Sequence, residues 1–269
     1  MSVFLYSEDF YNLLCKDKVM NKLQLKEDER LDNLLADETM KIIQSQSAFA
    51  FSLDAVLLAD FAKIPLKKGK ILDLCSGNAV IPLLLSRKTN VPITGVEIQA
   101  RLYDMAERNV RLNKLEDQIS MIHGDLKDMP TRFGNNKFDV VTVNPPYFQT
   151  KNKAHQNENH YLTIARHEIY CTLEDVVKAC SRLAKSGGKV AMVHRPARLM
   201  DILTLFRQYK IEPKRMRLVY PKKDKEANIV LIEGIRDGKP DLKMLPPFFA
   251  FYDNDQYSEE LEGILYGKQ

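Results

Sequence analysis

Short apolar runs alternate with longer amphipathic segments through the centre of the chain. The apolar runs, each suited to a strand buried on both faces, lie at 70–76, 92–97, 118–125, 137–144 and 189–195. Segments with apolar residues at near-helical spacing lie between them, at 78–89, 99–115 and 172–186. In the last of these, Thr172 predicts an N-cap and Gly187 with Gly188 predicts the helix stop. This alternation predicts a parallel sheet with helices on both faces.

The pattern changes after residue 195. Residues 196–210 predict a last crossover helix with Pro196 at its start. Two further apolar runs, 214–221 and 227–236, are separated by a charged loop that is too short for a crossover helix, so they are expected to pair antiparallel. The prediction is a doubly wound, seven-stranded, mostly parallel α/β sheet with an antiparallel terminal strand.

The 269 residues, of which 45% are hydrophobic, suit one large domain with small appendages. We expect a polar, mostly helical extension at 1–46, the α/β domain at 47–240, and a tail with a short helix at 241–269. No apolar run approaches the ~18 residues of a membrane span, and the acidic N-terminus does not resemble a secretory signal. These features predict a cytoplasmic protein; they leave open its oligomeric state and whether translation starts at Met1 or Met20.

Cysteine and histidine positions give no metal-site pattern. The four cysteines form no CxxC pair, so neither a disulfide framework nor a zinc site is expected; they are Cys15, Cys75, Cys171 and Cys180. His123 and His194 fall in predicted strands and are expected to be packed core residues. No metal is predicted.

The net charge is only +4, but basic residues are concentrated at 206–225, where eight lysines and arginines stand against two acids. Such a run is either a solvated face or a surface that binds phosphates. The sequence alone leaves both interpretations open.

Four successive predicted strands end in polar residues, at the edge where open sheets of this type bind ligands. They are Asp73 to Gly77, Glu97, Gly124 with Asp125, and the tetrapeptide from Asn144 to Tyr147. The first turn has one glycine in 76–81, and Asp73 would repel phosphate, so a dinucleotide is disfavoured. A cofactor with a ribose and a positive end but no phosphate, such as S-adenosylmethionine, fits better.

Several segments resemble the motifs of class I S-adenosylmethionine-dependent methyltransferases of the NPPY type, across roughly residues 51–236. They are DLCSGNAVIP at 73–82, GVEIQ at 95–99, HGDL at 123–126 and NPPY at 144–147. More narrowly, FSLDAVLLADFA at 51–62 and ARHE at 165–168 resemble the bacterial family that methylates N6 of the adenine beside the anticodon of a valine tRNA. Ala79 stands where members commonly carry glycine, which would place a methyl group against the cofactor.

The resemblance implies a role for each matching residue. S-adenosylmethionine would be held by Asp73, Cys75 and Gly77 at its methionine end, by Glu97 at the ribose, by Ile98, Asp125 and Leu126 at the adenine, and by Asn144 near the methyl group. The segment 148–168 would form a substrate lid. The tRNA would be contacted by Arg166, Lys214, Arg215, Arg217, Lys222 and Lys223.

The Asn-Pro-Pro-Tyr tetrapeptide suits transfer to a nitrogen conjugated with a π system. The lone pair of an adenine amino group is delocalised into the ring, so the amine is a poor nucleophile. Two acceptors, the Asn144 side-chain oxygen and the Pro145 carbonyl held rigid by Pro146, would favour its pyramidal form, while Tyr147 would stack on the base. A base within a stacked loop must first be turned out into such a pocket.

Other functions remain open on these residues. A side-chain amide fits the same clamp, so a protein glutamine N5-methyltransferase is one alternative, and another RNA or DNA amino-group methyltransferase is a second. A non-catalytic binding protein on the same scaffold is a third, although the intact Asp73, Glu97, Asp125 and Asn144 argue against it.

Overall fold

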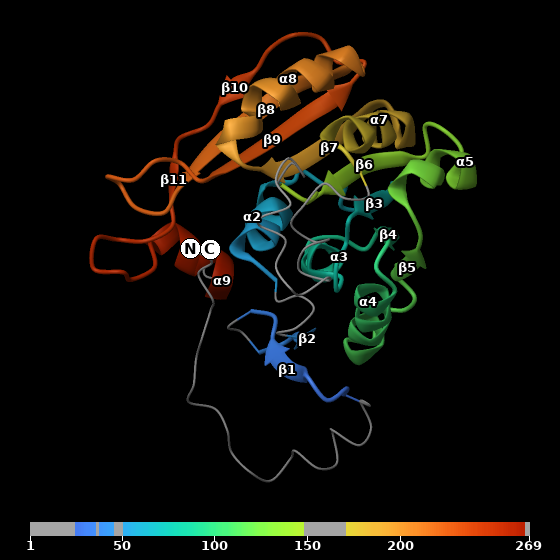
Figure 1. The fold of residues 1–269 in the computed structure, drawn as a ribbon, viewed down its shortest axis with the longest axis vertical. Helices are drawn as coiled ribbons and strands as arrows, with labels where there is room; N and C mark the ends of the chain where they lie inside the picture. The colour runs from blue at the N-terminus through green and yellow to red at the C-terminus, as the bar shows by residue number, and fades with distance from the viewer. Residues whose placement is uncertain (1–24, 36–37, 46–50, 148–170, 267–269) are drawn as a thin grey trace, which may run out of the picture.

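A twisted central sheet with helices on both faces forms the body of the protein (Figure 1). The computed structural model describes residues 25–35, 38–45, 51–147 and 171–266. The sheet's long strands are β3 (Ile71–Leu74), β4 (Ile93–Glu97), β5 (Ile119–His123), β6 (Phe138–Val143), β7 (Ala184–His194), β8 (Ile211–Tyr220) and β9 (Ile229–Arg236). Their spatial order is β8-β9-β7-β6-β3-β4-β5, and β9 runs antiparallel to both neighbours. The predicted fold class is confirmed.

The helices divide between the two faces of the sheet. They are α2 (Leu53–Phe61), α3 (Val80–Ser86), α4 (Ala100–Leu112), α5 (Met129–Phe133), α7 (Leu173–Leu183) and α8 (Leu199–Gln208), with 3-10 turns η1 (Leu126–Asp128) and η3 (Pro196–Arg198). Ile71 of β3 packs into the apolar cluster with residues of α2, α3 and α4. Its neighbour Leu72 packs into the opposite cluster, with α7 and α8. Alternate strand residues therefore serve two cores, as a doubly covered sheet requires.

The predicted helical extension before residue 46 is wrong for residues 29–33 and 41–45, which form two paired strands. Strand β1 (Glu29–Asn33) pairs antiparallel with β2 (Lys41–Ser45), and β2 contributes the fully buried Ile42 and Ile43. Ile43 packs with Leu102 and Met105 of α4. The density of charged residues suggested a solvated helix, but the two β-branched residues are covered by tertiary contacts, which local patterning does not reveal.

The predicted glycine stop of the helix at 172–186 is also wrong in position. Thr172 caps α7 as expected: its hydroxyl oxygen accepts the Asp175 amide, and its own amide donates to the Asp175 carboxylate. The helix ends at Leu183, however, and both glycines lie inside β7. They occupy an irregularity where the pairing with β6 shifts register, and a Cβ on Gly188 would lie 2.8 Å from the Lys185 carbonyl oxygen. The glycines therefore serve a bulge in the strand.

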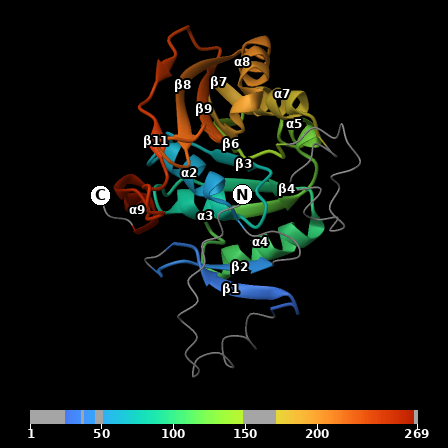
Figure 2. The same cartoon turned by 60° about the vertical axis from the view of Figure 1, so that its left-hand side comes forward.

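The C-terminal segment continues the sheet beyond β8. Two short strands, β10 (Lys243–Met244) and β11 (Phe248–Phe249), pair parallel with β8, and α9 (Glu259–Tyr266) follows them (Figure 2). Leu261 and Leu265 of α9 are buried in the same cluster as α2 and α3. Among the described helices, none has the length and apolar character needed to cross a bilayer.

Candidate active site

The carboxyl ends of four neighbouring strands meet at one edge of the sheet. The order β6-β3-β4-β5 places Leu74 beside both Val96 and Val143. The loops beyond the strands are joined by hydrogen bonds. The Gly77 amide donates to Glu97 Oε2 at 2.8 Å, and the Gly124 amide donates to the Glu97 carbonyl oxygen at 3.0 Å. The segments that the sequence pointed to are therefore brought together here.

The turn after β3 has an unusual backbone. Cys75, Gly77 and Ala79 all have positive φ, at 58°, 55° and 72°, so every second residue is left-handed. Such a conformation costs roughly 1 to 2 kcal/mol for a residue with a side chain, and such strain concentrates at functional sites. The Ala79 methyl is fully buried in the apolar cluster around α2 and α3. It therefore packs into the core, rather than projecting into open space where a cofactor would meet it.

Two carboxyl groups are buried side by side at this edge. Asp73 has no solvent exposure and accepts hydrogen bonds from Thr142 Oγ1 at 2.6 Å and Ser76 Oγ at 2.7 Å. Burial raises its pKa to about 7; the two hydroxyl donors oppose the rise, and the charge of Glu97 adds to it. Burial likewise raises the pKa of Glu97, whose oxygens accept from the Gly77 and Gln99 amides. Neither carboxyl forms an ion pair with any residue that the structure describes.

The other predicted cofactor residues surround these acids. Leu126 is buried, while Ile98 and Cys75 are half-buried. A hydrogen bond with Cys171 is the main cause that raises the pKa of the Cys75 thiol well above its ordinary value, and burial is the second. The Asp125 side chain accepts from the Lys127 amide at 2.9 Å and so caps η1.

The predicted core position of His123 is wrong. Its ring is exposed at the end of β5, where it stacks on Tyr103 with centroids 5.4 Å apart. Its Nε2 lies 2.9 Å from the Ile98 carbonyl oxygen. The ring thus lies on the surface over the β4 loop, because the last residue of an edge strand is not covered by a helix.

The Asn-Pro-Pro-Tyr tetrapeptide follows β6 directly. Pro145 is buried, and Asn144, Pro146 and Tyr147 are half-buried. The Tyr147 hydroxyl lies 2.5 Å from Asn144 Oδ1 and 2.8 Å from Asp54 Oδ2. Burial, and then the charge of Asp54, raise the pKa of Tyr147 well above its ordinary value. The hydroxyl therefore stays protonated and can donate.

Three residues of this site were not selected from the sequence: Asp54, His194 and Arg195. The guanidinium of Arg195 lies 4.8 Å from the centre of the Tyr147 ring and 3.7 Å from Asp54 Oδ2. His194 packs edge-on against the same ring at 5.1 Å. The available signals were an acid inside the apolar run of α2 and a basic residue at the carboxyl end of β7.

His194 is buried, as its strand position predicted, with 1% of its surface exposed. Burial, reinforced by the charge of Arg198, lowers its pKa to about 4, so the ring is neutral at pH 7. Its Nδ1 accepts the Arg195 amide at 2.8 Å, which places the proton on Nε2. That Nε2 has no hydrogen-bond partner among the described residues.

Two of the predicted RNA-contacting arginines are used inside the protein. Arg215 donates to Glu233 Oε1 at 3.0 Å and to the Phe61 carbonyl oxygen at 2.7 Å, and its guanidinium lies over the Phe61 ring. Arg217 donates to the Pro246 carbonyl oxygen at 2.9 Å and pairs with Glu260 at 2.6 Å. Arg217 therefore ties the C-terminal segment to β8.

The predicted lysines are more accessible. Lys214 lies 3.9 Å from Asp241, and Lys222 pairs with the exposed Asp255 at 2.8 Å. Lys223 is exposed. Since β8 runs antiparallel to β9, and β9 antiparallel to β7, the loop after β8 lies at the same edge of the sheet as Asn144. Arg166 and the whole predicted lid, residues 148–168, lie outside the described residues.

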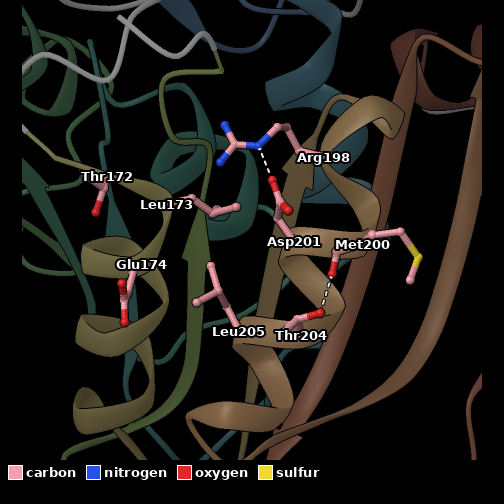
Figure 3. A pocket seen from close by; sticks show the side chains of 8 residues that line it. All are labelled: Thr172, Leu173, Glu174, Arg198, Met200, Asp201, Thr204 and Leu205. Atoms are coloured by element: carbon pink, nitrogen blue, oxygen red, sulfur yellow. Dashed lines mark hydrogen bonds and ion pairs between the residues drawn. The ribbon is translucent and has the colours of Figure 1, made fainter. Parts of the chain in front are cut away.

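A separate groove lies between the first turns of α7 and α8 (Figure 3). Its lining combines acids with one arginine, and Arg198 pairs with Asp201 at 2.7 Å within it. None of the predicted cofactor residues lines it. In the part of the chain that the structure describes, no three metal-ligating side chains are grouped as a metal site would need.

Comparison with known proteins agrees with this geometry. Residues 52–210 match the model of the family described as methyltransferase small domain. A tRNA1(Val) (adenine(37)-N6)-methyltransferase of Porphyromonas gingivalis is 28% identical over 201 residues, 71% of this chain and 76% of the relative. One of the same name from Aeromonas salmonicida is 26% identical over 187 residues, 69% of this chain and 76% of the relative.

Solved structures share the fold at low sequence identity. A predicted O-methyltransferase of Agrobacterium tumefaciens superposes with a TM-score of 0.62 at 18% identity, covering 80% of this chain and 97% of that one. Geranyl diphosphate C-methyltransferase of Streptomyces coelicolor, solved with S-adenosyl-L-homocysteine, gives 0.52 at 14% identity, covering 68% and 77%.

Proposed function

The chain belongs to the methyltransferase small domain family, and we propose that it transfers the methyl group of S-adenosylmethionine to N6 of an adenine in the anticodon-loop region of a tRNA. The observation that carries the proposal is the edge of the sheet. It combines two buried acids that pair with no cation among the described residues and an Asn-Pro-Pro-Tyr tetrapeptide at the end of the adjacent strand. The tRNA adenine-N6 enzymes among its relatives support the choice of acceptor.

The buried acids fit S-adenosylmethionine. A carboxyl group raised in pKa by burial gains most from a cation placed beside it, and this cofactor has a positive ammonium and a positive sulfonium. We assign Asp73, Cys75 and the Gly77 turn to the methionine end. Glu97 Oε1 and Oε2 each accept one backbone amide and keep lone pairs that can accept from the ribose hydroxyls. Ile98, Asp125 and Leu126 would bound the adenine.

When bound, the cofactor supplies an electrophilic methyl group. Asn144 Oδ1 and the Pro145 carbonyl would accept the two N–H bonds of the substrate amine, which directs its lone pair at the methyl carbon. Transfer would form the new N–C bond as the S–C bond breaks, and the substrate nitrogen would then release its proton to solvent. Orientation and fixed dipoles would supply most of the rate, with Tyr147 and the rigid Pro146 holding the geometry.

The tRNA backbone would meet the loop between β8 and β9. Lys223 and Lys225 are exposed on this loop at the carboxyl edge, whereas Arg215, Arg217 and Lys222 have partners within the protein. Phosphate contacts are therefore assigned chiefly to Lys223 and Lys225, with Lys222, Lys214 near the start of β8 and Arg166 as further contacts. A tRNA acceptor supports the proposal that the enzyme acts in the cytoplasm.

The clamp is tested by replacing Asn144. We expect Asn144→Ala to lower transfer to tRNA by at least a hundredfold, while the dissociation constant of S-adenosylmethionine changes less than threefold. Asn90→Ala, an exposed residue at the opposite edge of the sheet, is the matched control and is expected to behave as wild type. Full turnover by the Asn144 variant would contradict the role given to the clamp.

A further inference from the structure

Asp54 is an acid in the first turn of an otherwise apolar helix. Its side chain is only 9% exposed. It does not cap the helix, since the N-cap residue is Ser52. Its polar contacts in the described chain are with Tyr147 at 2.8 Å and Arg195 at 3.7 Å, and both of these residues follow strands at the active-site edge. Burying a carboxylate is unfavourable unless it is paired or hydrogen-bonded, so a buried acid such as Asp54 is expected to have specific partners.

The Tyr147 hydroxyl connects Asp54 to the clamp. It lies between Asp54 Oδ2 and Asn144 Oδ1, at 2.8 Å and 2.5 Å. An amide oxygen has two lone pairs, so a contact with Tyr147 leaves one for a substrate N–H. The ring is fixed by His194 on its edge and by the Arg195 guanidinium at 4.8 Å. The contact with the Tyr147 hydroxyl therefore sets the direction of the Asn144 side-chain oxygen.

We propose that Asp54 is a positioning residue for methyl transfer, which fixes the Tyr147 hydroxyl and through it the direction of the Asn144 amide oxygen. The inference rests on the proposed function, because it assigns the Asn144 oxygen to the substrate amine. Asp54 itself makes no contact with the reacting atoms. Arg195 balances its charge and is the only cation paired with it in the described part of the chain.

Such an arrangement matters because the rate of a reaction that depends on orientation is sensitive to the position of the groups that hold the substrate. Displacing a reacting group by about 1 Å can cost about a hundredfold in rate. Asn144 follows a strand end, where the backbone fixes the Cα position but leaves the side-chain torsions free. The single proton of the Tyr147 hydroxyl is shared between Asp54 Oδ2 and Asn144 Oδ1, and this three-centre contact restricts those torsions before the substrate arrives.

The test compares Asp54→Ala, Asp54→Asn and Tyr147→Phe in tRNA methylation, with kcat, KM and cofactor affinity measured separately. Asp54→Ala removes the acceptor and should lower kcat at least tenfold, with KM for tRNA and the cofactor dissociation constant within threefold of wild type. Asp54→Asn retains an acceptor oxygen and should recover most of that loss. Asp60→Asn, on the same helix but in an exposed pair with Lys88, should be unchanged.

A double variant and a structure complete the test. The double variant Asp54→Ala with Tyr147→Phe should have a kcat no lower than that of the slower single variant, because both substitutions break the same Asp54–Tyr147–Asn144 connection. A crystal structure of Asp54→Ala should show that Tyr147 and Asn144 have separated.

Three results would each overturn the inference. They are a wild-type kcat in Asp54→Ala, a kcat loss in the double variant equal to the product of the two single losses, and an unchanged 2.5 Å contact between Tyr147 and Asn144 in the variant structure. If the wild-type protein methylates no tRNA, the proposed function fails, and the crystal comparison still decides the role of Asp54.

Discussion

Asp73 allows a sharp test, because its burial makes the stability of the cofactor-free protein depend on pH. Its carboxyl is fully buried, and its pKa is raised from 3.8 to about 7. Between these values the folded chain keeps a proton that the unfolded chain has lost. The free energy of unfolding therefore falls as pH rises from about 4 to about 7, and the effect is complete above that range.

The size of the effect follows from the shift. Each pKa unit is worth about 1.4 kcal/mol, so ionising Asp73 in the folded protein costs on the order of 4 kcal/mol. Asp73→Asn is neutral at every pH and avoids this cost. Its amide would face the Thr142 and Ser76 hydroxyls, and the poorer hydrogen bonding would offset about 1 to 2 kcal/mol. We therefore expect the variant to be more stable than wild type at pH 8 by at least about 1 kcal/mol.

The assay is urea unfolding without cofactor at pH 4.5 and pH 8. Glu97 titrates in the same direction and is present in both proteins, so the difference between them reports Asp73 together with its electrostatic coupling to Glu97. At pH 4.5 the variant should be no more stable than wild type, and at pH 8 the order should reverse. The variant should also bind S-adenosylmethionine more weakly at pH 8. A variant that is destabilised equally at both pH values would refute the reasoning.

Three further predictions follow from the packing. Arg215→Glu leaves the buried Glu233 without its partner, so urea unfolding should show that the free energy of unfolding falls by about 3 to 5 kcal/mol. A variant as stable as wild type would contradict the structural role assigned to this arginine. Lys223→Glu should leave that stability unchanged but weaken tRNA binding and lower its salt slope by about 1 in filter binding, and an unchanged slope would show that the loop is only a solvated face. Ala79→Gly should change the unfolding free energy by less than about 1 kcal/mol, because relief of left-handed strain offsets the lost methyl burial; Ala79→Val should cost at least about 2 kcal/mol, and an equally stable valine variant would contradict the backbone conformation.

The sheet and the ends of its strands could be predicted from the sequence because they are local signals. The β-branched run of β6 and the Thr172 cap each depend on neighbours in the chain, and the structure agrees with both. The paired strands at 29–33 and 41–45 could not be predicted, because Ile43 is covered by Leu102 and Met105, more than fifty residues away. Gly187 and Gly188 indicated an irregular backbone at this point of the chain. They did not show whether the irregularity is the end of a helix or a bulge in a strand.

The site divides in the same way. Asp73 and Glu97 lie at the carboxyl ends of strands that the pattern identified, and Asn144 directly follows a third. Their meeting at one edge therefore follows from a parallel sheet. Asp54 and Arg195 reach the site from a helix and a strand separated by about 140 residues of chain. Arg215 shows the reverse case, since a basic run suggested phosphate binding while tertiary structure gives this residue an internal carboxylate partner.

The most direct test of the central claim is tritium transfer from labelled S-adenosylmethionine into bacterial tRNA, with a release-factor protein and duplex DNA as parallel acceptors, followed by nucleoside analysis. We expect label in tRNA as N6-methyladenosine, and none with Asn144→Ala. Label in the protein acceptor, as N5-methylglutamine, or in no acceptor while the cofactor still binds, would contradict it.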